Sequence, residues 1–407
     1  VNDKAWVNDN GNGNEWAVYN KSEPWEINGA VPRGVFEANG LFGSTVKISN
    51  DNNFALVGQP GYLSGTGAII NYVLSFDQEF IEDISVSSVA ANPIGLGSSL
   101  TSGKDIIAAG APGSASGRGY VFLYSRNFQG TISQSQILAP SIANADAFGT
   151  SVSISDDDQW LYVGAPNGDK VYVYGYYSDA SSEIDTITAN GNVSTFTLNY
   201  TPVSTELISV RGTGVDYVPF VDYTLSGSNI IFTAAPAADS IVVRQNPGYV
   251  YMNTIQSPNV GSLFGFSVAT TTEGAQVIVG APYGTATSGN ISLSRAGAVS
   301  VYDRSILKFI AIAGQTLFAG ISTITLVSKV YKGNDLQQLG TDYVIVAGTW
   351  IQFTVAPDAG TVVTVETDQF NLIETTNALV PQALSLFGFA VDICPNNCSI
   401  YAGAPYY

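Results

Sequence analysis

The side chains best placed to do chemistry in this 407-residue sequence are carboxylates gathered in short turns. Asp156, Asp157 and Asp158 are consecutive, and Asp51 lies in an Asn-rich run at the corresponding place in an earlier segment. Calcium needs six to eight such oxygens from a loop long enough to surround the ion. Because each run offers only a few residues, we interpret them as solvated hairpin tips, with calcium binding as the alternative.

Composition excludes several other kinds of site. Histidine is absent, which removes the commonest general base and the commonest transition-metal ligand. Two cysteines cannot supply a four-ligand zinc site of Cys and His. The acids are numerous, but no motif selects a pair for glycoside hydrolysis. We therefore predict a protein that is not an enzyme and has no cofactor.

The two cysteines, Cys394 and Cys398, flank another Asn-containing turn. Aligned with the Asp156 turn, they would face each other at the base of a hairpin, where a disulfide fits. We predict that bridge for an oxidising or extracellular setting, and two reduced thiols otherwise.

The elements that would hold these turns form a repeat. An aromatic-glycine pair, or Leu96-Gly97 in the second copy, is followed by two alternating apolar runs that close on Gly-Ala-Pro or Gly-Gln-Pro. The first residue and the proline are 18 residues apart in four copies and 16 in the second; the starts are Phe42, Leu96, Phe148, Phe264 and Phe387. Alternation with period two, bounded by Gly, Pro, Asn and Asp, predicts an antiparallel β-meander. Short meanders repeated about a centre form a propeller.

This pattern resembles the FG-GAP repeat, the blade unit of integrin α-subunit heads and of many secreted or surface β-propellers. The resemblance implies an all-β propeller, and it implies a calcium loop between the two motifs. The Asp-x-Asp-x-Asp-Gly spacing of such a loop is missing here. Propellers host binding and catalysis alike, so the resemblance indicates fold more than function.

The two ends of the chain look complementary. Residues 13–19 match the third-strand pattern of the repeats, and residues 386–407 carry only the first two strands. We predict that the ends share one blade and close a five-bladed ring. The alternative is that the chain is part of a seven-bladed protein.

Two of the repeats are interrupted by similar inserts. Each contains Asp-Tyr, then a strand ending in Phe-Thr-x-Ala-Pro, then a valine-rich strand, which predicts a small β-sandwich. These inserts resemble modules of tailed-phage fibre and appendage proteins. The predicted division is propeller 1–181, first sandwich 182–246, propeller 247–304, second sandwich 305–368, and a closing half blade 369–407.

Small polar loops between the second and third strands are the predicted binding face. They carry Tyr62, Arg118, Asn167, Tyr283 and Arg295. Surplus tyrosines, including Tyr62, Tyr176, Tyr177, Tyr283, Tyr406 and Tyr407, could stack on sugars or simply cover strand surfaces.

The net charge of −18 disfavours binding to nucleic acid and to anionic lipid. The sequence has no run of 18 apolar residues, so we predict no membrane-spanning helix. Together the two resemblances imply a tailed-phage virion component, located in the extracellular particle as a tail, fibre or decoration protein. Its partners would be other virion proteins, further copies of itself, or a glycan or protein of the host surface. The alternatives are a bacterial adhesin or cell-surface scaffold, secreted or on the cell surface, and then a polysaccharide-degrading enzyme.

Overall fold

The chain is nearly all-β in its computed structural model, which confirms the all-β part of the predicted fold class. The two α-helices among the described residues, α1 (Tyr62–Gly65) and α2 (Ser114–Gly117), are single turns. No helix in the described part of the chain is long and apolar enough to cross a membrane. The structure describes residues 4–9, 15–20, 26–31, 40–49, 54–74, 80–86, 93–127, 131–178, 182–257, 259–288, 291–319, 329–347, 350–378, 382–393 and 399–405.

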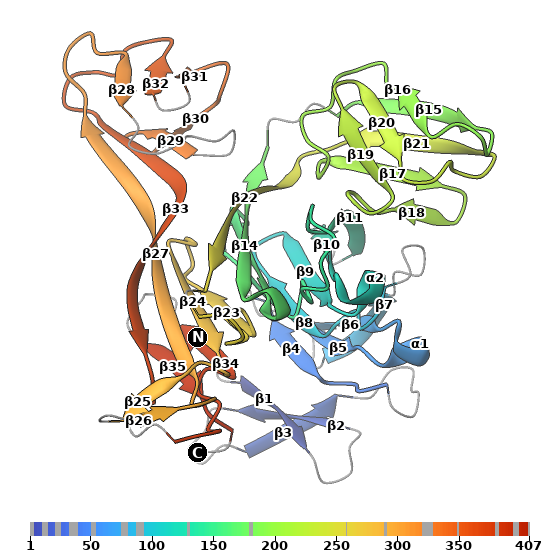
Figure 1. The fold of residues 1–407 in the computed structure, drawn as a ribbon, viewed down its shortest axis with the longest axis vertical. Helices are drawn as coiled ribbons and strands as arrows, with labels where there is room; N and C mark the ends of the chain where they lie inside the picture. Colours follow the sequence, from blue (N-terminus) through green and yellow to red (C-terminus); the bar gives the residue numbers. More distant parts are fainter. Residues whose placement is uncertain are drawn as a thin grey trace.

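Four antiparallel meanders of four strands form the body of the molecule (Figure 1). The first two contain β4 (Thr45–Ile48), β5 (Phe54–Gln59), β6 (Ala68–Leu74) and β7 (Phe80–Val86), and then β8 (Ser99–Ser102), β9 (Ile106–Ala111), β10 (Tyr120–Arg126) and β11 (Ile132–Leu138). The third contains β12 (Ser151–Ile154), β13 (Trp160–Ala165), β14 (Lys170–Tyr177) and β22 (Gly248–Gln256). The fourth begins with β23 (Ser267–Thr270), β24 (Gln276–Ala281), β27 (Ala298–Ile310) and β33 (Val362–Thr376).

Successive meanders lie side by side through their first strands. β4 neighbours β8, β8 neighbours β12, and β12 neighbours β23, which in turn neighbours β34 (Ala390–Ile393). Apolar residues of facing sheets form shared cores, such as Phe54, Leu56, Phe122 and Tyr124 between the first two. This is the propeller-like arrangement that the repeat predicted.

A hydroxyl recurs at each junction between meanders. The Thr or Ser two residues after the Phe-Gly or Leu-Gly glycine donates to the carbonyl of the corresponding glycine in the next meander. The four bonds are Thr45 to Gly97 (2.9 Å), Ser99 to Gly149 (2.8 Å), Ser151 to Gly265 (2.8 Å) and Ser267 to Gly388 (2.9 Å).

The two ends of the chain do not share a sheet in the described pairings. β34 pairs with β35 (Ile400–Gly403) as a two-stranded sheet. β1 (Lys4–Asp9), β2 (Glu15–Asn20) and β3 (Glu26–Val31) form a sheet of their own. The shared closing blade that the sequence suggested is therefore absent from these pairings.

Residues 184–245 form two sheets with a separate core, at the upper right of Figure 1. We call this region insert 1. One sheet has the order β15 (Ile184–Ala189), β21 (Asp239–Gln245), β17 (Ile208–Gly212), β18 (Val215–Tyr217). The other has the order β16 (Thr195–Thr197), β20 (Asn229–Phe232), β19 (Tyr223–Ser226). Tyr223 and Phe232 lie in the core between them.

Residues 306–366 repeat this plan at the upper left of Figure 1 and are called insert 2. Here the long strands β27 and β33 run from the fourth meander into the insert. Within the insert, β33 pairs with β29 (Lys329–Lys332), which pairs with β30 (Asp335–Gln337). The facing sheet has the order β28 (Leu317–Ala319), β32 (Trp350–Phe353), β31 (Tyr343–Val346). A small hairpin, β25 (Ala286–Ser288) and β26 (Ile291–Leu293), extends the fourth meander at its other end.

Candidate functional site

A hollow of about 270 Å³ opens where the third meander, the link after β11 and insert 1 meet. Pockets for small ligands lie preferentially at such junctions between structural units. The hollow is lined by Ala139, Pro140, Ser141, Ile142, Lys170, Tyr172, Tyr174, Glu206, Tyr251 and Thr254.

Strand alternation explains how the aromatic wall is built. Lys170, Tyr172 and Tyr174 occupy every second position of β14, so their side chains share one face of the sheet. Tyr251 lies directly opposite Tyr174 on β22. Its ring meets those of Tyr172 and Tyr174 edge-on, with centroids 6.2 and 6.1 Å away. Phe148 packs behind the two strand tyrosines, which fixes the wall from the inside.

Tyr172 and Tyr174 are neutral hydrogen-bond donors at physiological pH. Burial raises the pKa of Tyr172 to about 12, and it raises the pKa of Tyr174 well above the ordinary value. Tyr251 is 43% exposed, and its hydroxyl lies 3.0 Å from that of Thr254. The hollow therefore has a rigid aromatic floor and a more accessible ring at its mouth.

Its charged groups are few and partly balanced. Lys170 Nζ donates to Asp146 Oδ2 at 3.0 Å in a partly buried ion pair. Glu206 is contributed by insert 1, and its carboxylate accepts a hydrogen bond from the Ser204 hydroxyl. With Lys170 paired, the lining has a small negative balance, so it offers hydrogen-bonding groups without a strong attraction for anions.

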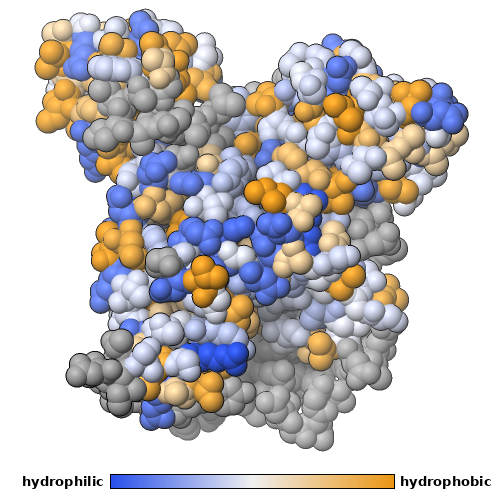
Figure 2. Space-filling view, viewed as in Figure 1, coloured by the Kyte–Doolittle hydropathy of each residue, from blue (hydrophilic) through white to orange (hydrophobic). Residues whose placement is uncertain are grey.

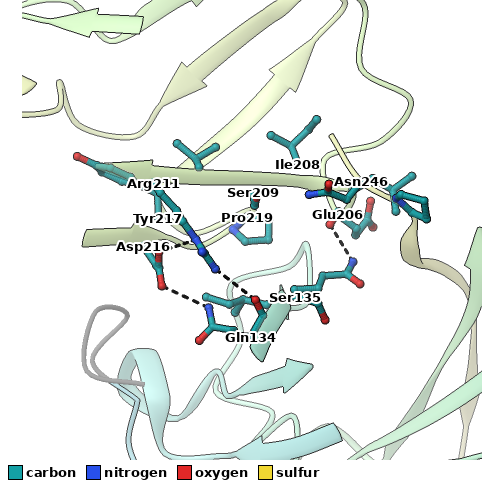
Figure 3. A pocket seen from close by; sticks show the side chains of 15 residues that line it. Gln134, Ser135, Glu206, Ile208, Ser209, Arg211, Asp216, Tyr217, Pro219 and Asn246 are labelled. Atoms are coloured by element: carbon teal, nitrogen blue, oxygen red, sulfur yellow. Dashed lines mark hydrogen bonds and ion pairs between the residues drawn. The ribbon is translucent and has the colours of Figure 1, made fainter. Parts of the chain in front are cut away.

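Insert 1 is held over this region by a polar seam, shown in Figure 3. The side-chain amide of Gln136 on β11 donates to the carbonyls of Glu206 and Tyr249, each at 2.8 Å. Beside it, Arg211 pairs with Asp216 at 3.1 Å, and Gln134 donates to the same carboxylate at 3.3 Å (Figure 3). The cavity along the seam is about 30 Å³, room for about one water molecule. The seam positions Glu206 at the hollow.

Arg118 has a different place from the one that the sequence suggested. It was predicted on an exposed binding loop, but it is buried. Its Nε donates to the Pro140 carbonyl at 3.1 Å, and its Nη1 donates to the Phe220 carbonyl of insert 1 at 3.1 Å. Arg118 thus ties insert 1 and the hollow's Pro140 to the second meander, and the loop prediction is corrected for this residue.

The other predicted loop residues are distributed over separate meanders. The Arg295 guanidinium stacks on Tyr283 at 4.3 Å, Asn167 is exposed and donates to the Ala145 carbonyl, and Tyr62 lies on α1. Apart from the stacked pair, the structure does not bring these side chains into one site.

The predicted acidic turn is occupied by internal hydrogen bonds. Asp157 accepts from the Ser155 hydroxyl and from the Gln159 amide, while Asp158 is buried against the second meander. No group of three His, Cys, Asp or Glu side chains that could hold a metal occurs among the described residues. Asp51, Cys394 and Cys398 lie outside the described residues.

The lining of the hollow was missed at the sequence level. The run Lys-x-Tyr-x-Tyr at residues 170–174 places three ligand-type side chains on one face of a strand and was a usable signal. The sequence could not place Tyr251 and Glu206 beside this run, because Glu206 lies within insert 1 and Tyr251 follows insert 1 in the chain.

No family model matches the chain, and no curated protein matches it. Several solved structures are similar at low identity. A Bacteroides uniformis protein assigned as a 6-phosphogluconolactonase is 12% identical over 89% of this chain and 96% of its own, with a TM-score of 0.35. The periplasmic gluconolactonase PpgL of Pseudomonas aeruginosa is 10% identical over 91% of this chain and 98% of its own, with a TM-score of 0.34. Hsv2 of Kluyveromyces lactis is 7% identical over 74% of this chain and 59% of its own, with a TM-score of 0.38.

These comparisons contradict the predicted function. The similar structures include proteins named as sugar-lactone enzymes, and no virion protein is among those named here. The prediction of a tailed-phage virion component is therefore wrong. At TM-scores below 0.4, the neighbours' activities do not transfer to this chain.

Proposed function

We propose that the tyrosine-lined hollow binds a neutral saccharide. The observation that carries this proposal is the convergence of Tyr172, Tyr174 and Tyr251 with Lys170, Glu206 and Thr254 around a space of about 270 Å³. That volume lies just below the usual range for ligand pockets and suits a single sugar ring with a substituent.

The chemistry of the lining matches such a ligand. The C–H faces of a sugar ring pack against aromatic rings, and its hydroxyls need donors and acceptors at the edges of that contact. The phenols and Lys170 donate, while Glu206 accepts. A net charge of −18 on the chain and the carboxylate of Glu206 disfavour an anionic sugar.

We also propose that the meanders are FG-GAP-type blades and that inserts 1 and 2 are small β-sandwich domains placed in consecutive blades. The recurring hydroxyl bond between Phe-Gly segments supports a common blade unit. The separate core of each insert supports independent domains. On this proposal β34 and β35 are the first two strands of a fifth blade.

The test is a titration with glucose, galactose, mannose and N-acetylglucosamine, in which saturation-transfer NMR and calorimetry measure binding. The proposal expects at least one of them to bind with a Kd of about 1 mM or below. Tyr251→Ala removes the most accessible ring and should weaken binding about tenfold, the size expected for one aromatic contact. Tyr251→Phe keeps the ring and should bind nearly as well as the native protein.

Tyr62→Ala is the matched control, because Tyr62 lies on α1 outside the hollow. Its affinity should equal that of the native protein. Absence of binding by all four sugars at about 100 mM, far above a 1 mM Kd, would contradict the proposal. An equal loss of affinity in the Tyr62 and Tyr251 variants would contradict it as well.

A further inference from the structure

The two inserts share one strand plan but differ in polarity on one face. Tyr223 pairs with Phe232 in insert 1, and Tyr343 pairs with Phe353 at the same place in insert 2. The third strands align as well, since Phe196 pairs with Ile230 and Phe318 pairs with Ile351. Each outward position of one sheet therefore has an equivalent in the other.

In insert 1 that outward face is mostly polar. Strand alternation places six side chains on the face that points away from the core: Thr195, Thr197, Thr224, Ser226, Asn229 and Ile231. In insert 2 the equivalent described positions hold Leu317, Val344, Val346, Trp350 and Gln352.

These apolar side chains are open to solvent. Leu317 is 42% exposed, Val344 40%, Val346 37% and Trp350 40%. Figure 2 shows hydrophobic residues gathered along the outer side of insert 2, at the upper left. Since the same plan folds in insert 1 with polar residues at these places, the fold of the module does not require an apolar surface there.

We propose that this outward face of β28, β32 and β31 in insert 2 is a contact surface for a second copy of the chain. A two-fold contact places the same patch of both copies face to face, so a patch with a net charge would meet a patch of the same sign. The whole chain carries −18, yet the face contains no charged residue. This face therefore avoids the repulsion that a charged patch would meet in a self-contact.

Gln352 supplies a second argument for a copy of the same chain. It is the polar residue of the face, and it lies between Leu317 and Val344 in the sheet register. A carboxamide carries both a donor and an acceptor, so two glutamines related by a two-fold axis can satisfy each other. The apolar side chains around it would exclude water from that pair.

The position of insert 2 leaves the face reachable. Insert 2 is carried on the ribbon of β27 and β33, and Lys329 on its inner sheet donates to Gln159 of the third meander. The sheet of β28, β32 and β31 lies on the far side of the insert from the meanders (Figure 1). Insert 1, in contrast, is seated on the second meander by Gln136 and Arg118.

The size of the face makes the expected dimer weak. Three strands about 4.8 Å apart, each of about four residues at 3.4 Å, cover about 200 Å². Stable complexes bury about 800 Å² on each partner. The contact should therefore be weak, so the dimer should appear only at high protein concentration, where mass action favours association.

Sedimentation velocity between about 10 and about 500 μM tests the assignment, over the range where a weak Kd becomes visible. The native chain should shift from monomer to dimer across this series. The triple variant V344T, V346S and W350N carries the insert 1 residue at each position and should weaken the dimer at least tenfold. Thermal unfolding and sugar binding should stay unchanged, which shows that the variant folds.

Ile184→Thr is the control, because it removes an exposed apolar residue of insert 1 instead. The dimer should survive it. A native chain that stays monomeric throughout the series overturns the proposal. A second outcome also overturns it: the protein stays monomeric, and its Trp350 fluorescence shifts when phosphatidylcholine vesicles are added. The Trp350 signal is obtained by subtracting the spectrum of the W350N variant. The face would then bind a lipid surface.

Discussion

Asp158 shows how one side chain can take a role that its sequence context hides. It lies in a run of three acids expected to be a solvated turn, yet it is buried between the second and third meanders. Its Oδ2 accepts from the Asp105 amide at 2.7 Å, and its carbonyl accepts from the Tyr249 hydroxyl at 2.7 Å. Its Oδ1 has no hydrogen-bond partner. Burial raises the pKa of the carboxyl to about 6.

The raised pKa predicts a pH-dependent stability. Because the folded state holds this proton more tightly than the unfolded state, whose pKa is near 3.8, protonation stabilises the fold below about pH 4. That contribution is lost as the pH rises through about 6, and it amounts to about 2 to 3 kcal/mol. Asp158→Asn keeps an acceptor for the Asp105 amide and removes the titration.

Urea unfolding of the native protein and of Asp158→Asn between pH 4 and pH 8 measures this effect. As the pH rises, the free energy of unfolding of Asp158→Asn should increase relative to that of the native protein. Other carboxylates titrate equally in both proteins and cancel. Curves that stay parallel over this range would show that Asp158 titrates near its ordinary pKa.

At the scale of the elements, the junction between meanders explains the repeated motifs. A Cβ on Gly164, in the Gly-Ala-Pro of the third meander, would lie 2.0 Å from the Gly265 carbonyl oxygen. The same close approach occurs at Gly58, Gly110 and Gly280, at 2.1, 1.9 and 2.1 Å. The glycine leaves room for the carbonyl that the Ser or Thr hydroxyl binds. Phe-Gly and Gly-Ala-Pro are thus two sides of one contact.

The fifth copy lacks this contact among the described residues. Ala390 stands where the other copies carry Ser or Thr, and the nearest atom to a Cβ on Gly403 would be 3.7 Å away. We therefore expect Gly164→Ala to destabilise the protein by about 1 to 3 kcal/mol, as overpacking typically does. Gly403→Ala should change stability by less than about 0.5 kcal/mol.

Thermal unfolding of the two alanine variants tests this contact, with Gly403→Ala as the matched control. A large loss of stability in Gly164→Ala alone is the expected result. Equal midpoints for both variants would mean that successive meanders are not in contact through these glycines.

Sequence alone predicted the elements well where the signal was local. Period-two runs between fixed Phe-Gly and Gly-Ala-Pro motifs specify strands and turns, so the meanders followed from spacing. The hollow could not be predicted in the same way. Tyr174 and Tyr251 become neighbours only when the β14 and β22 register is known, and insert 1 separates them in the chain. Arg118 likewise gave no sign that insert 1 would cover it.

At the scale of the whole molecule, the two inserts have different proposed roles. Insert 1 is seated on the second meander, and through Glu206 it completes the proposed sugar site. Insert 2 is carried on the ribbon of β27 and β33, with Lys329 against the third meander, and its outer sheet presents the proposed self-contact. Although both modules repeat one plan, their outward faces and attachments differ, so each can serve a separate contact.

The most direct measurement is a crystal structure of the protein soaked with the sugar that binds tightest in the titration. The account predicts density for one sugar ring between Tyr172, Tyr174 and Tyr251, with hydroxyls within hydrogen-bond distance of Lys170 or Glu206. An empty hollow at saturating ligand, or density for the sugar elsewhere on the molecule, would contradict it.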